Sequence, residues 1–284
     1  MASASIIDTH LHLLYRDRLS YPWLAGVAAL DRDARYERYA EEARRCGVTG
    51  ALHMEADVAE PDIEAETGNV EALARDEASL IRGAISACRP ESPDFPAFLE
   101  RALADPFVKG FRRVLHVAPD ELSERPIFRQ NLRRLSGAGR PFDLCVRPDQ
   151  LDKAIALADA CPDLAFVLDH CGAQSITPRV QPLWRAKIAE IAKRPNVAVK
   201  LSGVVAYADP KSWVLDDLRP TVEQAIGLFG WDRVVWGSDW PVCTLTASLS
   251  IWLAATHALT SGASAEEREK LFASNARRLW RLQG

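Results

Sequence analysis

The sequence lacks the glycine motifs that mark several large enzyme classes. Its 15 glycines form no Gly-x-Gly-x-x-Gly run and no phosphate-cradling loop, so neither a dinucleotide-binding fold nor a P-loop enzyme is expected. A Gly-x-Ser-x-Gly elbow is also absent, and Gly237-Ser238-Asp239 does not imitate one, which argues against a serine-hydrolase triad.

Clusters of basic residues and paired cysteines are missing as well. The 35 lysines and arginines are offset by 39 acidic residues, and no basic block is longer than an Arg-Arg pair, so no nucleic-acid partner is expected. The six cysteines include no Cys-x-x-Cys pair and no compact framework, which indicates thiols in a reducing compartment.

Long apolar runs are absent too. No stretch approaches the roughly 18 residues that a membrane span requires. The first residues show no cationic region followed by an apolar core, so no signal peptide is expected. We therefore expect a cytoplasmic protein with a small-molecule substrate and no membrane partner; the sequence does not determine its oligomeric state.

What is present is a regular alternation of short β-branched runs and longer amphipathic ones, the pattern of a parallel sheet covered by helices. The alternation predicts one α/β domain over residues 1–284, a (β/α)8 TIM barrel; an open doubly wound sheet is the alternative. Predicted strands cover residues 5–12, 48–54, 80–87, 108–115, 141–146, 164–170, 196–202 and 233–239. Predicted helices lie near residues 33–46, 67–78, 94–104, 127–138, 149–160, 179–193, 217–229, 247–258 and 265–282.

Active sites of such barrels lie at the carboxyl ends of the strands, where this sequence places several polar residues. His10 and His12 end the first predicted strand, and alternation puts both on one face, where they offer two nitrogens to a metal or a carbonyl oxygen. Asp239 and His170 end strands eight and six. A turn-capping aspartate and a structural histidine are the alternatives for these two. Asp169 is expected to face away from His170 and to be structural.

Further polar and aromatic residues fall near the same mouth. Arg112 on strand four could bind a substrate in a bidentate manner, although a surface arginine pair is nearly as good an interpretation. Lys200 on strand seven and Glu55 after strand two could contact a polar substrate. The long first loop, residues 13–32, could carry Trp23 over the mouth.

Six ordered motifs resemble one family. They are Ile-Asp-Thr-His-Leu-His (residues 7–12), Tyr-Pro-Trp-Leu (21–24), Lys-Gly-Phe-Arg (109–112), Leu-Asp-His-Cys-Gly (168–172), Val-Lys-Leu-Ser-Gly (199–203) and Gly-Ser-Asp-Trp-Pro-Val (237–242). Together they resemble the amidohydrolase superfamily, in its amidohydrolase-2 branch of sugar-lactone hydrolases. The resemblance implies a distorted barrel that hydrolyses aldonolactones such as fucono-, rhamnono- or galactono-lactone.

The resemblance also implies roles for individual residues. Asp239 would be the general base, and His10, His12 and His170 would polarise the lactone carbonyl, directly or through a metal. Arg112, Lys200 and Trp240 would hold the sugar.

The cofactor is left open by one departure from the family pattern. Strand five carries no histidine, which argues against a two-metal site. Two alternatives remain: a single zinc ion bound by His10, His12, His170 and Asp239, or a mechanism without a metal. Two other functions are compatible with the same barrel: a zinc-dependent non-oxidative decarboxylase, and a catalytically silent barrel that binds a sugar acid.

Overall fold

The computed structural model describes residues 5–173 and 181–283. Its eight strands pair in parallel in their sequence order. Short, largely apolar segments buried on both faces form them, as expected for a sheet enclosed by helices. Their bounds are β1 Ile6–Leu11, β2 Val48–Met54, β3 Ile81–Ala87, β4 Val108–Val114, β5 Phe142–Cys145, β6 Phe166–Leu168, β7 Val197–Leu201 and β8 Val234–Trp236.

The sheet closes between β8 and β1. The backbone N–H of Asp239 donates to the carbonyl of His10 at 2.8 Å, and that of His12 donates to the carbonyl of Trp240 at 2.8 Å. A barrel is therefore confirmed over the alternative of an open sheet. The same two bonds tie His10 to Asp239 and His12 to the next residue, Trp240.

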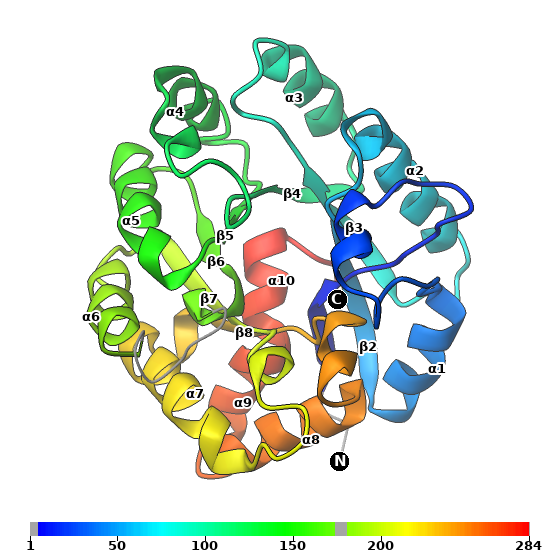
Figure 1. Ribbon diagram of the computed structural model, residues 1–284, viewed down its shortest axis with the longest axis vertical. Helices are drawn as coiled ribbons and strands as arrows, with labels where there is room; N and C mark the ends of the chain where they lie inside the picture. The colour runs from blue at the N-terminus through cyan, green and yellow to red at the C-terminus, as the bar shows by residue number, and fades with distance from the viewer. Residues whose placement is uncertain (1–4, 174–180, 284) are drawn as a thin grey trace.

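Helices follow the strands and surround the barrel (Figure 1). Their bounds lie within a few residues of the predicted ones, with two exceptions. The predicted start at residue 179 falls outside the described residues, and the predicted last helix, residues 265–282, is divided into α9 and α10. The bounds are α1 Tyr36–Arg45, α2 Ile63–Ala74, α3 Phe95–Ala104, α4 Pro126–Arg133, α5 Leu151–Ala160, α6 Gln181–Ile191, α7 Leu215–Phe229, α8 Leu249–Leu259, α9 Ala265–Glu269 and α10 Asn275–Trp280. None of the helices in the described ranges combines the length and the hydropathy of a membrane span.

The C-terminal segment fills the amino-terminal end of the barrel. A π-helical turn, Lys270–Ser274, joins α9 to α10, and α10 lies at the centre of the ring of helices (Figure 1). Ala276 and Trp280 pack with apolar side chains from the interior of the strands, including Ile7, Ile85 and Val235. Apolar side chains therefore fill this end of the barrel, and the polar site residues lie at the carboxyl ends of the strands.

Most strands are one or two residues shorter than predicted, and β6 and β8, which have three residues each, fall short by the most. β6 stops at Leu168 and β8 at Trp236, because the chain turns sharply beyond each of them. His170 and Asp239 have φ angles of 54° and 57°, in the left-handed region that costs a non-glycine residue roughly 1–2 kcal/mol. Non-glycine residues with left-handed backbone angles are frequent at functional sites. The two turns therefore indicate a functional site at the barrel mouth.

Candidate active site

Four side chains from the carboxyl ends of β1, β6 and β8 meet in the barrel. Nε2 of His12 and Nε2 of His10 lie 3.5 and 3.7 Å from Oδ1 of Asp239. Nδ1 of His170 lies 4.0 Å from the other carboxylate oxygen, Oδ2. All four residues are buried. The structure thus brings together the four residues that the sequence selected.

Two glycines make this close approach possible. A Cβ on Gly203, whose φ is +63°, would lie 2.5 Å from Nδ1 of His170 and 2.9 Å from Oδ2 of Asp239. A Cβ on Gly237 would lie 2.6 Å from that of His10. Both positions therefore require glycine on steric grounds. Sequence reasoning gave these glycines no role, although both stand in the motifs that carry the family resemblance.

Hydrogen bonds orient two of the rings. Nδ1 of His12 donates to the carbonyl of Met54 at 2.9 Å, so the lone pair of the neutral ring is on Nε2, facing Asp239. His170 shares a hydrogen bond of 2.9 Å between Nδ1 and Oγ of Ser202. Within the described chain, Oδ2 of Asp239 is buried and has no hydrogen-bond partner. A buried carboxylate oxygen without a partner is costly, so it is available to a water, a substrate or a cation.

A layer of buried charges lies beneath this centre. Nζ of Lys200 is 2.5 Å from Asp143 and 3.0 Å from Asp169. Nε of Arg112 is 2.6 Å from Glu55, and its Nη1 is 3.3 Å from Asp169. Networks of buried ion pairs of this kind rigidify a site, while removal of one member leaves an uncompensated charge.

Burial and neighbouring charges set the pKa values in this layer. Burial acts most strongly on Asp169 and raises its pKa, but the charges of Lys200 and Arg112, together with the contact to His10, outweigh burial and hold the pKa well below the ordinary value. For Asp143, burial and the negative charge of Asp169 raise the pKa to about 7 despite the nearby ammonium. Burial lowers the pKa of His10 well below its ordinary value, so that ring is neutral near pH 7.

The predicted orientation of Asp169 is wrong, although its expected place behind the central residues is not contradicted. This residue does not face away from the centre: its carboxylate lies 3.4 Å from Nδ1 of His10 and contacts Lys200 and Arg112. Strand alternation does not apply, because β6 ends at Leu168 and His170 has left-handed backbone angles. Asp169 and His170 consequently both point into the barrel.

The five predicted substrate-binding residues occupy different environments. Glu55, Arg112 and Lys200 are buried in the charged layer. Trp23 is partly buried, and its Nε1 donates to the carbonyl of Ala56 at 2.8 Å, which ties the first loop to the segment after β2. Trp240 is buried with its ring 5.6 Å from that of Tyr39 in α1.

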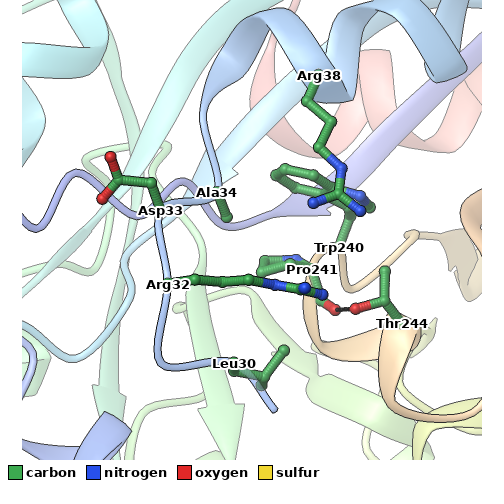
Figure 2. A pocket seen from close by; sticks show the side chains of 8 residues that line it. All are labelled: Leu30, Arg32, Asp33, Ala34, Arg38, Trp240, Pro241 and Thr244. Atoms are coloured by element: carbon green, nitrogen blue, oxygen red, sulfur yellow. Dashed lines mark hydrogen bonds between the residues drawn. The ribbon is translucent and has the colours of Figure 1, made fainter. Parts of the chain in front are cut away.

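Trp240 also lines a small pocket between its own loop and the segment before α1 (Figure 2). Its neighbours there include Leu30, Arg38, Pro241 and Thr244. The cavity volume is ≈ 10 Å³, enough for about one water molecule and far too small for a sugar. This pocket therefore does not serve as a substrate site.

The donor set at the centre fits a single divalent cation. One ligand atom each from His10, His170 and Asp239 lies within 4.8 Å of the others, and all three residues are buried. His12 has the arrangement typical of a metal-binding histidine, with its other nitrogen bonded to a carbonyl. Nitrogen and carboxylate donors of this kind are typical of zinc sites.

Comparison with known proteins gives consistent matches along the whole barrel. The amidohydrolase family matches residues 7–282. An L-fucono-1,5-lactonase from Burkholderia ambifaria is 30% identical over 197 residues, 68% of each chain. Another, from Burkholderia multivorans, is 29% identical and covers 97% of this chain and 96% of its own. The crystal structure of an amidohydrolase from Burkholderia multivorans with bound zinc is 28% identical, with a TM-score of 0.88 over 99% of this chain and 100% of that one.

Proposed function

The chain belongs to the amidohydrolase family, and from that premise we propose that it hydrolyses a small sugar lactone, an aldonolactone. One observation carries the proposal: Oδ2 of Asp239, which has no hydrogen-bond partner among the described residues, is buried at the barrel mouth beside three histidines. Such a carboxylate can accept a proton from water within a site that offers nitrogens to a carbonyl oxygen. The lactone names of the two curated relatives support a cyclic ester of a sugar acid as the substrate class.

In the proposed reaction, Asp239 removes a proton from a water molecule as its oxygen attacks the lactone carbonyl carbon. The carbonyl electron pair moves to oxygen and gives a tetrahedral intermediate, which collapses with cleavage of the ring C–O bond. Asp239 then returns its proton to the departing ring oxygen, so the products are a carboxylic acid group and a hydroxyl on one open chain. One water is consumed and no oxidant or reductant is needed.

Ring N–H groups of His10 and His170 stabilise the negative oxygen of the intermediate, whereas Nε2 of His12 carries a lone pair and can contribute only as a metal ligand. Fixed donors aimed at a developing charge are often the largest contribution to catalysis. A divalent metal held by His10, His12, His170 and Asp239 would supply Lewis-acid polarisation of the carbonyl and lower the pKa of water. A lactone is an activated ester and demands less electrophilic help than an amide, so a metal-free reaction is the alternative.

A lactone panel assayed with a pH indicator tests this function. Acid release from fucono-, rhamnono- or galactono-lactone is the expected result, and its absence from every lactone, with or without added zinc, would reject it. The same assay after chelation separates a metal-dependent from a metal-independent reaction. Release of carbon dioxide from an aromatic acid, with no lactone opened, would point to a decarboxylase instead.

A further inference from the structure

The side chains expected to hold the sugar are already bonded within the protein. Nε and Nη2 of Arg112 each donate to an oxygen of Glu55. The ammonium of Lys200 lies between the carboxylates of Asp143 and Asp169. Small-molecule sites orient their ligands through a few polar groups that remain free to bind them. A sugar lactone therefore requires another polar side chain at the barrel mouth.

Tyr207 lies beside the four central residues, in the same loop after β7 as Gly203. It ends a short helical turn, Val205–Tyr207. The ring of Tyr207 approaches that of His170 edge-on, with ring centres 6.4 Å apart and planes at 70°. The residue as a whole is 39% exposed, unlike the buried residues of the charged layer. A ligand at the barrel mouth can therefore reach it.

The hydroxyl of Tyr207 differs from those of the other four tyrosines. Each of the others takes part in a hydrogen bond with a backbone group or a carboxylate; these are Tyr15, Tyr21, Tyr36 and Tyr39. Across residues 5–173 and 181–283, no group forms a hydrogen bond with the hydroxyl of Tyr207. A tyrosine hydroxyl has one proton to donate and can also accept. This one is available to a ligand.

Neighbouring charges indicate that the hydroxyl faces the barrel. Burial raises the pKa of Tyr207, and the negative charge of Asp239 raises it further. The charge of Arg112, in the layer beneath the centre, acts in the opposite direction. The exposed part of the residue is thus not its hydroxyl end, which points toward Asp239 and keeps its proton near pH 7.

Tyr207 also lines a cavity large enough for a sugar ring. Its volume is ≈ 520 Å³, and its walls include Val204, Asp209 and Thr221. Sites for small molecules have volumes of roughly 300–1,000 Å³. The pocket beside Trp240, at ≈ 10 Å³, is far below that range. Tyr207 therefore borders both the central residues and a space of the size that a sugar lactone requires.

We propose that Tyr207 is a specificity-determining residue: its hydroxyl donates a hydrogen bond to a ring hydroxyl of the sugar lactone whose carbonyl lies at Asp239. This assignment rests on the proposed lactonase function. The bond is made in the bound substrate and in the transition state alike, so it contributes to KM rather than to kcat. It involves none of the ligand atoms that fit a divalent cation, and it is therefore the same with a cation bound there or without one.

The kinetics of Tyr207→Phe test the proposal, because this variant removes the hydroxyl and keeps the ring beside His170. For the sugar lactone that the unaltered protein opens fastest, KM is expected to rise about 3- to 10-fold, with kcat changed less than about twofold, as for one lost hydrogen bond in binding. Tyr36→Phe is the matched control, since its hydroxyl accepts from the backbone N–H of Leu80 at 2.7 Å and its KM should not change. An unchanged KM in Tyr207→Phe, or a fall in kcat alone, would overturn the proposal.

Binding of sugar acids separates this proposal from the proposed function. If no lactone is opened, the lactonase function is rejected, and titration calorimetry with fuconate, rhamnonate and galactonate decides the role of Tyr207 without turnover. The expected result is an affinity about 3- to 10-fold lower in Tyr207→Phe than in the unaltered protein for the acid that binds best. Equal affinities of the two proteins, or no binding of any of the three acids, would overturn the proposal.

Discussion

Gly203 and Asp239 lie so close that no side chain fits between them: a Cβ on Gly203 would be 2.9 Å from Oδ2 of the carboxylate. The same Cβ would be 2.5 Å from Nδ1 of His170. One glycine on the loop after β7 therefore sets the separation of two site residues that come from β6 and β8. The left-handed backbone of Gly203 thus allows the carboxylate of Asp239 and the ring of His170 to approach each other.

Gly203→Ala is expected to lower lactone hydrolysis by on the order of 100-fold, because displacements near 1 Å in a site have effects of that size. Gly230 provides a matched control. Its φ of +67° is nearly the same, but no atom lies within 4 Å of the position of its Cβ. Gly230→Ala should therefore lose stability, by on the order of 1–3 kcal/mol, without the loss of activity, because its φ of 67° and ψ of 165° lie in a region essentially restricted to glycine. Equal activities of the two variants would show that Gly203 does not set the geometry of the site.

Arg112→Met is expected to lower the free energy of unfolding by about 3–5 kcal/mol, since it leaves Glu55 and Asp169 as buried carboxylates with less compensation. The exposed pair of Arg45 and Glu41, with side chains 73% and 64% exposed, supplies the control. Arg45→Met should change the free energy of unfolding by less than about 1 kcal/mol. Urea denaturation of the two variants measures both values. A small effect of Arg112→Met would mean that the charged layer does not contribute to stability.

His53 is expected to destabilise the protein in mild acid. Burial, followed by the charges of His12 and Arg112, lowers its pKa in the folded state to about 3. In the unfolded chain a histidine takes up a proton near pH 6.5, so stability is lost as the pH falls from there toward 3, by at most about 1.4 kcal/mol per pH unit. Unfolding measured at pH 7.5 and pH 5.0 should show a smaller decrease in His53→Gln than in the unaltered protein. An identical decrease would exclude this residue as a cause.

Much of the architecture was predictable because it follows from local patterns. The eight β-branched runs and the helices between them correspond to the observed order of elements, and the spacing of His10 and His12 predicts that both face the barrel interior. The lengths of β6 and β8 were not predictable, because the left-handed angles of His170 and Asp239 are stabilised by contacts from other strands. For the same reason alternation gave the wrong face for Asp169.

Residue type alone did not indicate the partners of the charged side chains. Arg112 and Lys200 were expected at the barrel mouth, where they would meet a substrate, yet both are buried against carboxylates contributed by other strands. Those pairings join residues 57 positions apart in the chain, such as Arg112 with Glu55 and Lys200 with Asp143. The helical pattern near the C-terminus likewise gave no sign that Trp280 enters the barrel.

The central claim is that Asp239 is the base of a lactone hydrolase, and the most direct test is acid release by Asp239→Asn in the lactone panel. Asp232→Asn serves as the control, because Asp232 has a side chain 79% exposed and pairs with Lys270 at the surface. We predict that Asp239→Asn folds, as judged by its circular dichroism spectrum, and loses at least about 1,000-fold in kcat, whereas Asp232→Asn retains full activity. Turnover by folded Asp239→Asn at the rate of the unaltered protein would contradict the account.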